Sequence, residues 1–129
     1  RVYYEDTDAA GIVYYANYFR FIERGRTEFL RELGHDQNEL MKDGIAFAVR
    51  SARAEFLKPA KLDDLLTVET GVESLGRAQL VFSQRIRRNE ELLLDAKIRV
   101  ACIDPARGRP IPMPRALHVQ LAALLEPPR

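Results

Sequence analysis

Residues 5 to 18 are the part of the sequence best suited to chemistry. Three carboxylates, Glu5, Asp6 and Asp8, precede a run of small residues that ends at Gly11, and a helical pattern follows. The first turn of a helix has unpaired backbone N–H groups and a partial positive charge, so it can hold an oxyanion. A carboxylate a few residues upstream can act there as a nucleophile or as a general base.

A plainer role explains the same carboxylates. Asp is common near helix starts, so the pattern by itself favours Asp8 as a residue that caps the helix or closes a turn. We expect Asp6 to be a solvated or turn-forming acid. The small residues before the helix would let a substrate approach the backbone.

Other reactive residues are few. The single Cys102 excludes an internal disulfide, and its strand-like surroundings predict a buried small hydrophobe. His35 is expected to interact with the last carbonyls of the long helix, and His118 to lie on the surface. The sequence lacks metal-ligand spacing, a glycine-rich phosphate loop and a Ser or Cys nucleophile motif, so we predict no metal and no cofactor.

A helical pattern positions the candidate residues. Its apolar or small members are Tyr14, Tyr18, Phe21, Ile22, Gly25 and Phe29. They predict a helix from about Val13 to Leu33, ended by Gly34. Because Gly25 costs roughly 1 kcal/mol against Ala in a helix, we expect the helix to approach a sheet closely there. A short helix over Asn38–Lys42 should follow.

Strands account for most of the remaining chain. Period-2 alternation predicts strands over Arg1–Glu5, Ile45–Leu57 and about 66–73, 80–87 and 92–102. Alternation of this kind is typical of an antiparallel sheet with one buried face, and short turns between the last three runs predict hairpins. A terminal helix over Arg115–Leu125 would place Leu117, Leu121 and Leu124 on one side.

The element order predicts an α+β fold in a single domain over residues 1–129. A lone long helix cannot cover both faces of a five-stranded sheet, so the sheet edge is expected to pair with a second copy of the chain. The sequence begins at Arg1 without Met, so we expect a few native residues before it; no signal peptide pattern is present.

Composition excludes several classes of protein. The chain has 129 residues, 47% hydrophobic and 30% charged, as in ordinary globular proteins, and no apolar run approaches the ~18 residues of a membrane span. A net charge of +1 argues against a nucleic-acid partner. Of the 20 basic residues, 16 are Arg, which binds phosphate and carboxylate as a planar fork.

A family resemblance runs along the whole chain. The matching stretches are Arg1-Val2-Tyr3-Tyr4-Glu5-Asp6-Thr7-Asp8-Ala9, Gly11-Ile12-Val13-Tyr14, Glu23-Arg24-Gly25-Arg26-Thr27-Glu28, Pro59-Ala60-Lys61-Leu62-Asp63-Asp64 and Val81-Phe82-Ser83-Gln84-Arg85-Ile86. In this order they resemble the hotdog-fold acyl-CoA thioesterases of the 4-hydroxybenzoyl-CoA thioesterase class, above all the Tol–Pal-associated YbgC branch. The resemblance implies one long central helix wrapped by a curved antiparallel sheet of about five strands.

The same resemblance implies a reaction and its residues. It predicts hydrolysis of a short-chain or aromatic acyl-CoA, with a catalytic carboxylate at Asp8 and a backbone N–H at Tyr15 that polarises the thioester carbonyl. Gly11, Val13 and Asn17 would bind substrate. The YbgC branch often has His at the Tyr15 position, whereas the 4-hydroxybenzoyl branch has Tyr, so the resemblance leaves the acyl preference open.

The resemblance also implies an assembly. Acyl-CoA, or an acyl group on an acyl-carrier protein, would lie across a subunit interface of a homodimer or homotetramer in the cytoplasm. Arg77 would contact a CoA phosphate, although a solvated turn residue fits its position equally well. Two alternatives remain: a hydratase on the same fold, which the lack of His near Tyr15 disfavours, and a non-catalytic acyl-thioester-binding module.

Overall fold

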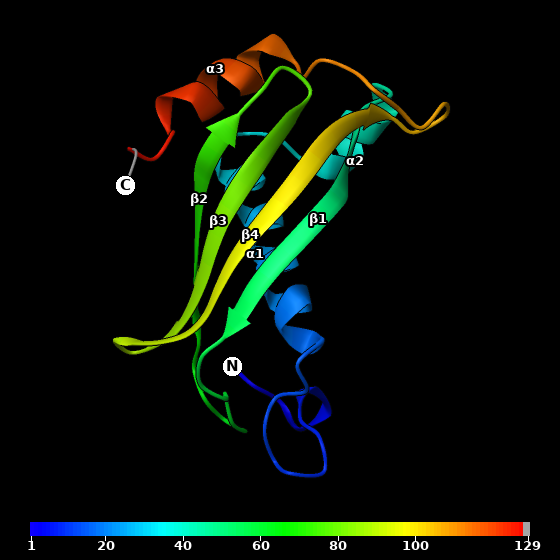
Figure 1. Cartoon of the computed structure of the whole chain (residues 1–129). Helices are drawn as coiled ribbons and strands as arrows, with labels where there is room; N and C mark the ends of the chain where they lie inside the picture. Colours follow the sequence, from blue (N-terminus) through cyan, green and yellow to red (C-terminus); the bar gives the residue numbers. More distant parts are fainter. Residues whose placement is uncertain (128–129) are drawn as a thin grey trace.

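A curved antiparallel sheet is the main feature of the structure, a computed structural model that describes residues 1–127 (Figure 1). Four long strands lie in the order β1-β4-β3-β2, and a short fifth strand pairs with β4. The strands are β1 (Ala46–Phe56), β2 (Thr67–Leu75), β3 (Gln79–Arg88), β4 (Glu91–Asp104) and β5 (Arg109–Pro110). The α+β class and the antiparallel pairing are thus confirmed.

Short turns set the order of the central strands. β2, β3 and β4 follow one another as hairpins, and Asn89 closes the second turn with φ +55°, which Asn adopts more readily than most residues. β1 joins the far side of β4 with Ala46 opposite Ile103 and Phe56 opposite Leu94. Both β1 and β2 are therefore edge strands within the described part of the chain.

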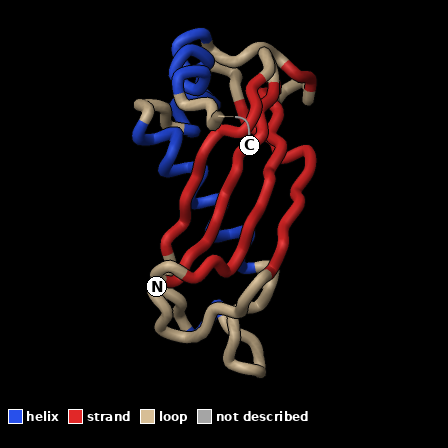
Figure 2. The backbone as a smooth tube through the Cα atoms, turned by 60° about the vertical axis from the view of Figure 1, so that its left-hand side comes forward, coloured by secondary structure: helices blue, strands red, loops and turns tan. Residues whose placement is uncertain are grey.

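Helix α1 (Asn17–Glu32) runs along one face of the sheet, where it is visible behind the strands in Figure 2. Its buried residues Ile22 and Leu30 belong to one hydrophobic core with sheet residues such as Ile98. The other helices are α2 (Gln37–Lys42) and α3 (Arg115–Ala123).

At Gly25, helix α1 packs close against the sheet. A Cβ atom there would be 2.7 Å from Val68 Cγ1 and 3.0 Å from Thr70 Oγ1. This confirms the close approach predicted from the glycine. Gln84 of β3 also lies next to Gly25. It is fully buried, and its Nε2 donates to the Ile22 carbonyl of α1 at 2.8 Å.

The start of the chain differs from the prediction. Arg1–Glu5 is not a strand, because residues Tyr4–Asp6 form the 3-10 helix η1, and the Tyr3 N–H donates to Asp6 Oδ2 at 3.0 Å. Asp6 is accordingly turn-forming, as expected, but it is buried rather than solvated. A local hydrogen bond of this kind competes with strand pairing.

Helix α1 begins four residues later than Val13, the predicted start. Ile12 and Val13 are held extended by bridges to Lys61 and Thr7, which helical periodicity alone could not reveal. The predicted end is confirmed, since Gly34 has φ +89° and follows the helix as a C′ glycine.

Two details near α3 also differ in part from expectation. His35 does interact with a last carbonyl of α1, but through its backbone, since its N–H donates to the Leu30 carbonyl at 2.9 Å. Its side chain has another partner: Nε2 lies 2.6 Å from Gln120 Oε1, and Gln120 Nε2 donates to the Leu33 carbonyl at 2.8 Å. Leu117 and Leu121 are buried as predicted, whereas Leu124 lies beyond the end of α3 and is exposed.

Nowhere in residues 1–127 is there a helix with both the length and the apolar character needed to cross a bilayer.

Candidate functional site

Asp8 begins a tight turn at the end of the molecule that also holds the chain start, the dark-blue loop at the bottom of Figure 1. Its Oδ1 accepts the Ala10 N–H at 2.8 Å, and its carbonyl accepts the Gly11 N–H at 3.0 Å. Gly11 has φ +79°, a conformation that favours glycine. The Asp8 carboxylate closes the turn as the plainer role predicted, yet it stays exposed to solvent with its second oxygen unbonded within residues 1–127.

Buried contacts fix this turn on the rest of the fold. The Val13 N–H donates to the Ala60 carbonyl at 2.8 Å, and the Val13 side chain is buried in the core. Asn17, the first residue of α1, donates from Nδ2 to the Asp6 carbonyl at 3.0 Å. The amide of Asn17 therefore ties the helix start to the acidic loop.

Tyr15 lies in the turn just before α1. The Tyr14 N–H donates to the Asp6 carbonyl, and the Asn17 N–H donates to the Tyr14 carbonyl, but the N–H of Tyr15 has no acceptor within residues 1–127. The N-cap residue Ala16 supplies no side-chain cap. A backbone donor at the positive end of α1 is thus available to an oxyanion.

An apolar cavity of about 320 Å³ opens beside Tyr15. Its walls come from the Asp8 turn, the start of α1 and the segment that follows β1. The lining residues are Ile12, Val13, Tyr15, Tyr18, Phe56, Leu57, Lys58 and Pro59. Apart from Lys58, these lining residues are apolar or aromatic, which suits an apolar acyl group.

Aromatic rings shape one wall of the cavity. The Phe56 ring lies 6.2 Å from the Tyr15 ring and 5.6 Å from the Tyr18 ring, both edge-on, an arrangement that aromatic pairs favour. The buried Tyr18 hydroxyl accepts the Ala60 N–H at 2.9 Å, and burial raises the pKa of Tyr18. The helical periodicity placed Tyr18 on the apolar stripe of the long helix, whereas no feature of the sequence marked Phe56 as a site residue.

Arg77 does not lie with the other candidates. Asp8, Gly11, Val13, Tyr15 and Asn17 occupy one continuous segment at the bottom of Figure 1, whereas Arg77 is an exposed residue of the β2–β3 turn at the top. β3 has ten residues, so about 30 Å of strand separates the two ends of the sheet. Within one protomer, Arg77 and the segment from Asp8 to Asn17 therefore cannot contact the same part of a substrate.

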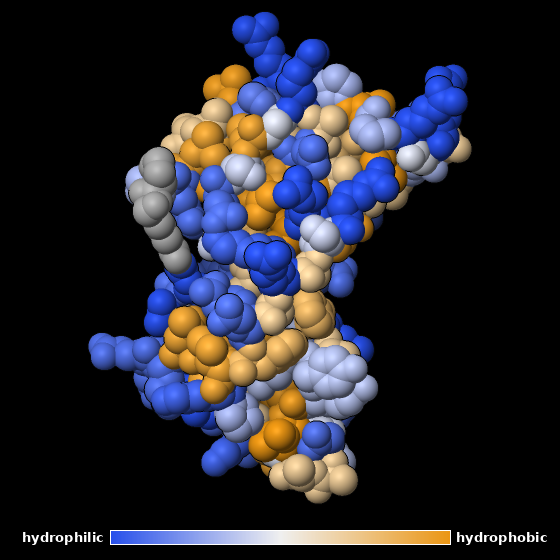
Figure 3. All heavy atoms as spheres, in the orientation of Figure 1, coloured by the Kyte–Doolittle hydropathy of each residue, from blue (hydrophilic) through white to orange (hydrophobic). Residues whose placement is uncertain are grey.

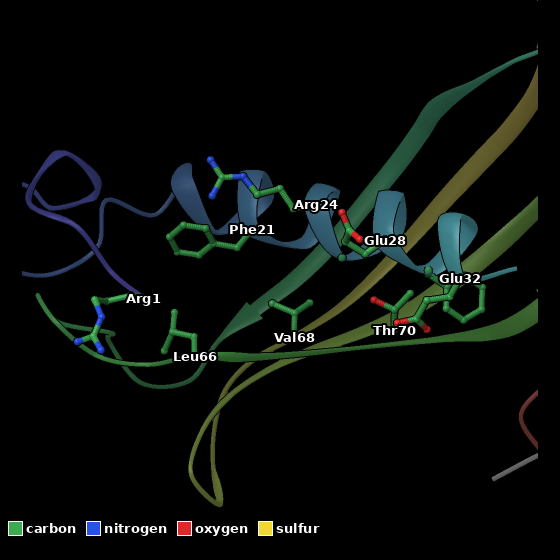
Figure 4. A pocket seen from close by; sticks show the side chains of 10 residues that line it. Arg1, Phe21, Arg24, Glu28, Glu32, Leu66, Val68 and Thr70 are labelled. Atoms are coloured by element: carbon green, nitrogen blue, oxygen red, sulfur yellow. The ribbon is translucent and has the colours of Figure 1, made fainter. Parts of the chain in front are cut away.

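A larger groove, about 410 Å³, lies between α1 and the free edge of β2 (Figure 4). Phe21 from the helix and Leu66 and Val68 from the strand side form its apolar part, with Arg24 and Glu28 at its rim. None of the six predicted site residues lines this groove. The larger of the two spaces is therefore not the one beside the predicted site residues.

The surface at the Asp8 end is rich in exposed apolar and aromatic residues. In Figure 3 hydrophobic residues are visible on both the upper and the lower part of the face in view, with hydrophilic side chains between and around them. The large exposed side chains around the loop are Tyr3, Tyr4, Tyr14, Tyr15, Phe56, Leu57, Leu62 and Leu65. Exposed apolar side chains that gather on one surface of a soluble protein commonly mark a binding surface.

Comparison with known proteins decides the family. The model of the thioesterase-like superfamily matches residues 2–121. The chain belongs to this superfamily. It is 46% identical over 118 residues to the acyl-CoA thioester hydrolase YbgC of Escherichia coli O6:H1, and the match covers 91% of this chain and 88% of that protein.

Solved structures agree with this placement. A probable thioesterase from Bartonella henselae superposes with a TM-score of 0.84 at 39% identity, covering 88% of this chain and 94% of that one. The gentisyl-coenzyme A thioesterase BH1999 superposes with a TM-score of 0.87 at 26% identity, covering 95% and 96%. The hotdog fold and the resemblance to the YbgC branch are therefore confirmed for this superfamily member.

Proposed function

We propose that this protein hydrolyses the thioester bond of acyl-CoA, with Asp8 as the catalytic carboxylate. The main support is that one segment, from Asp8 to the start of α1, holds both an exposed carboxylate and the Tyr15 N–H that no other group accepts within residues 1–127. An apolar cavity lies beside Tyr15. The names of the relatives, an acyl-CoA thioester hydrolase and a gentisyl-coenzyme A thioesterase, support the same reaction.

The proposed chemistry needs one charged side chain. As a general base, Asp8 takes a proton from water while the water oxygen attacks the thioester carbon. The Tyr15 N–H donates to the oxyanion that forms. The tetrahedral intermediate then collapses, the C–S bond breaks, and the thiolate of CoA leaves and takes up a proton. If Asp8 attacks directly, water hydrolyses the resulting anhydride to give the same products.

The cavity beside Tyr15 is the proposed acyl site. Its apolar lining and volume of about 320 Å³ suit a short-chain or aromatic acyl group. Val13 would form part of its wall, Gly11 would leave room for the thioester, and Asn17 would act by holding the helix start rather than by touching substrate. Phe56 and Tyr18 join the list of proposed acyl contacts.

We also propose that the working unit is a homodimer that pairs through β1. This strand has an unpaired edge of 11 residues, and Val49, Phe56 and the following Leu57 are large exposed hydrophobic residues along it. An edge of this length and character invites strand pairing with a second copy. The proposal also includes that residues 1–129 form one domain and that the protein acts in the cytoplasm.

Steady-state release of free thiol from a panel of thioesters tests this function. The panel comprises short-chain, long-chain and aromatic acyl-CoAs, together with an acyl-carrier-protein thioester. We expect turnover with at least one short-chain or aromatic acyl-CoA. Binding without thiol release would favour the non-catalytic module, and hydration of an enoyl-CoA without thiol release would favour the hydratase.

A further inference from the structure

The loop of residues 58–64, between β1 and β2, is bonded to two parts of the proposed site. The carbonyl of its buried Ala60 accepts the Val13 N–H at 2.8 Å, and the Ala60 N–H donates to the Tyr18 hydroxyl at 2.9 Å. Val13 follows the Asp8 turn, and Tyr18 lies in the first turn of α1. A shift of this loop would therefore move the Asp8 turn relative to the start of the helix.

The same loop supplies part of the proposed acyl site and has a backbone that needs support. Lys58 and Pro59 are among the residues that line the apolar cavity beside Tyr15. Near the other end of the loop, Asp63 has φ +69°. Residues other than glycine adopt this left-handed conformation at a cost in free energy, so contacts from outside the loop must maintain it.

Arg88, the last residue of β3, provides such contacts from the sheet. Its Nη1 donates to Asp64 Oδ2 at 2.7 Å and to the Pro59 carbonyl at 3.3 Å. Asp64 Oδ2 also accepts the Lys61 N–H at 2.8 Å, which closes a turn within the loop. One guanidinium group thus joins the early and the late part of the loop.

Glu91 holds this guanidinium group from another side. Its Oε1 accepts from Arg88 Nη2 at 3.1 Å, and its Oε2 accepts from Lys58 Nζ at 3.0 Å. Burial opposes ionisation of Asp64, but the hydrogen bonds from the Lys61 N–H and from Arg88 outweigh it and hold the pKa of Asp64 below its usual value. The side chains of Arg88 and Asp64 are 22% and 20% exposed, so their ion pair is better shielded than one at the open surface.

We propose that Arg88 is a positioning residue for the thioester hydrolysis, because it fixes the 58–64 loop on which the Asp8 turn and Tyr18 depend. This inference rests on the proposed function. Arg88 does not line the cavity beside Tyr15, so it acts through the loop rather than by touching substrate. A guanidinium group carries its donors in a rigid fork that can serve several acceptors at once, which the single ammonium of lysine cannot match.

The neighbouring Arg87 is the matched control. It lies in the same strand and forms an ion pair of its own, with Nε 2.6 Å from Glu69 Oε1. Its other hydrogen bond is to the Glu90 carbonyl, and within residues 1–127 it makes none to the 58–64 loop. Substitution of Arg87 therefore removes an arginine and its ion pair from β3 without releasing the loop.

Kinetics of Arg88→Met test the positioning role. Methionine is also a long side chain, but it donates no hydrogen bond to the loop. Because a small misplacement of reacting groups slows the chemical step, we expect kcat to fall roughly ten-fold. KM should stay within about two-fold, since the interactions that are lost act in the transition state. Arg87→Met should keep the wild-type kcat and KM.

Further variants separate positioning from a general loss of stability. All assays are run well below the unfolding midpoint of each variant. Arg88→Lys keeps the charge opposite Asp64 but not the fork, so its kcat should lie between those of wild type and Arg88→Met. Arg88→Met combined with Asp64→Asn should lose no more activity than the worse single variant, because both substitutions break the same pair. Losses that multiply, or an Arg88→Lys protein as slow as Arg88→Met, would overturn the proposal.

Amide hydrogen exchange tests the fixing of the loop without using turnover. We expect the Val13 and Ala60 amides to exchange at least about ten-fold faster in Arg88→Met than in wild type, because both depend on the loop. The amide of Ile98, in the core of the central strand β4, should keep its rate, and Arg87→Met should keep all three rates.

The two measurements distinguish failure of this inference from failure of the proposed function. If no thioester releases thiol with the wild type, the proposed function is refuted, while faster exchange in Arg88→Met still supports the fixing of the loop. Unchanged exchange at Val13 and Ala60 overturns the inference. Faster exchange with unchanged kcat also overturns it, because the loop would then move without consequence for the reaction.

Discussion

At the scale of single residues, Asp8 is the side chain on which the proposed chemistry depends. Asp8→Asn keeps an oxygen that can accept the Ala10 N–H and removes the negative charge. Because the turn survives while the base or nucleophile is lost, we expect kcat to fall by roughly 100-fold or more, the usual effect of removing a positioned acid–base group. Thiol release under saturating acyl-CoA measures the change.

Asp43→Asn is the matched control for this substitution. Asp43 is an exposed carboxylate that follows α2, far along the chain from the turn. It should leave kcat unchanged, and both variants should keep the wild-type unfolding midpoint. Near-normal turnover in a folded Asp8→Asn protein would show that Asp8 only closes the turn.

At the scale of elements, Gly25 sets how closely α1 approaches β2. The added Cβ of Gly25→Ala would meet Val68 Cγ1 at 2.7 Å, closer than real Cβ contacts come. Overpacking costs about 1–3 kcal/mol, and the better helix propensity of Ala returns roughly 1 kcal/mol. We expect a net loss of about 1 kcal/mol in urea unfolding, while Arg20→Ala on the exposed side of α1 stays near neutral. A more stable Gly25→Ala protein would contradict the close approach.

A buried polar network joins α1 to the sheet at the same place. Gln84 Oε1 accepts from Arg26 at 2.9 Å, and Gln84 Nε2 donates to Thr70 Oγ1 at 3.0 Å. Burial lowers the pKa of Arg26, and the hydrogen bond to Gln84 offsets part of the cost of burying the guanidinium. Gln84→Leu leaves the guanidinium without it and should destabilise the protein by about 1–3 kcal/mol.

A double-mutant cycle checks that this cost comes from the network. Arg26→Met removes the stranded charge, so the double variant with Gln84→Leu should lose less stability than the two single losses combined. A coupling of about 0.5 kcal/mol or more is expected for residues in direct contact. Strict additivity would show that Gln84 contributes by packing alone.

At the scale of the whole molecule, β1 is the proposed seam between two copies. Val49→Lys places a charge on that edge, the device by which natural sheets prevent pairing. We expect sedimentation to show a folded monomer at micromolar concentration. Thiol release from acyl-CoA should fall with it, because the family resemblance implies that acyl-CoA lies across the subunit interface. Val119→Lys on α3 is the control, since Val119 is 60% exposed and Val49 53%.

Two results would contradict an interface at β1. If Val49→Lys remains a dimer while Val119→Lys dissociates, the interface lies at α3 instead. If wild type sediments as an active monomer, the proposed homodimer is wrong.

Local sequence patterns were sufficient for most elements because the physics that forms them is local. Alternation defined the four long strands, and Gly34 marked the end of α1 through its positive φ. The helix start could not be found in this way, since Val13 is held extended by Thr7 and, through its N–H, by Ala60, a partner 47 residues away. The strand expected at Arg1–Glu5 failed for a similar reason, because Asp6 forms η1 instead.

The sequence alone determined the family and the segment from Asp8 to Asn17, since a carboxylate, a tight glycine turn and a helix start are adjacent in the chain. Only the tertiary structure brought Phe56 to Tyr15 to make an apolar cavity, and only it separated Arg77 from Asp8. The physical reason is that strand order and register, here β1 beside β4, depend on long-range pairing and burial summed over the whole sheet. Periodicity within a strand indicates which face is buried, but it does not indicate which end of another strand lies beside it.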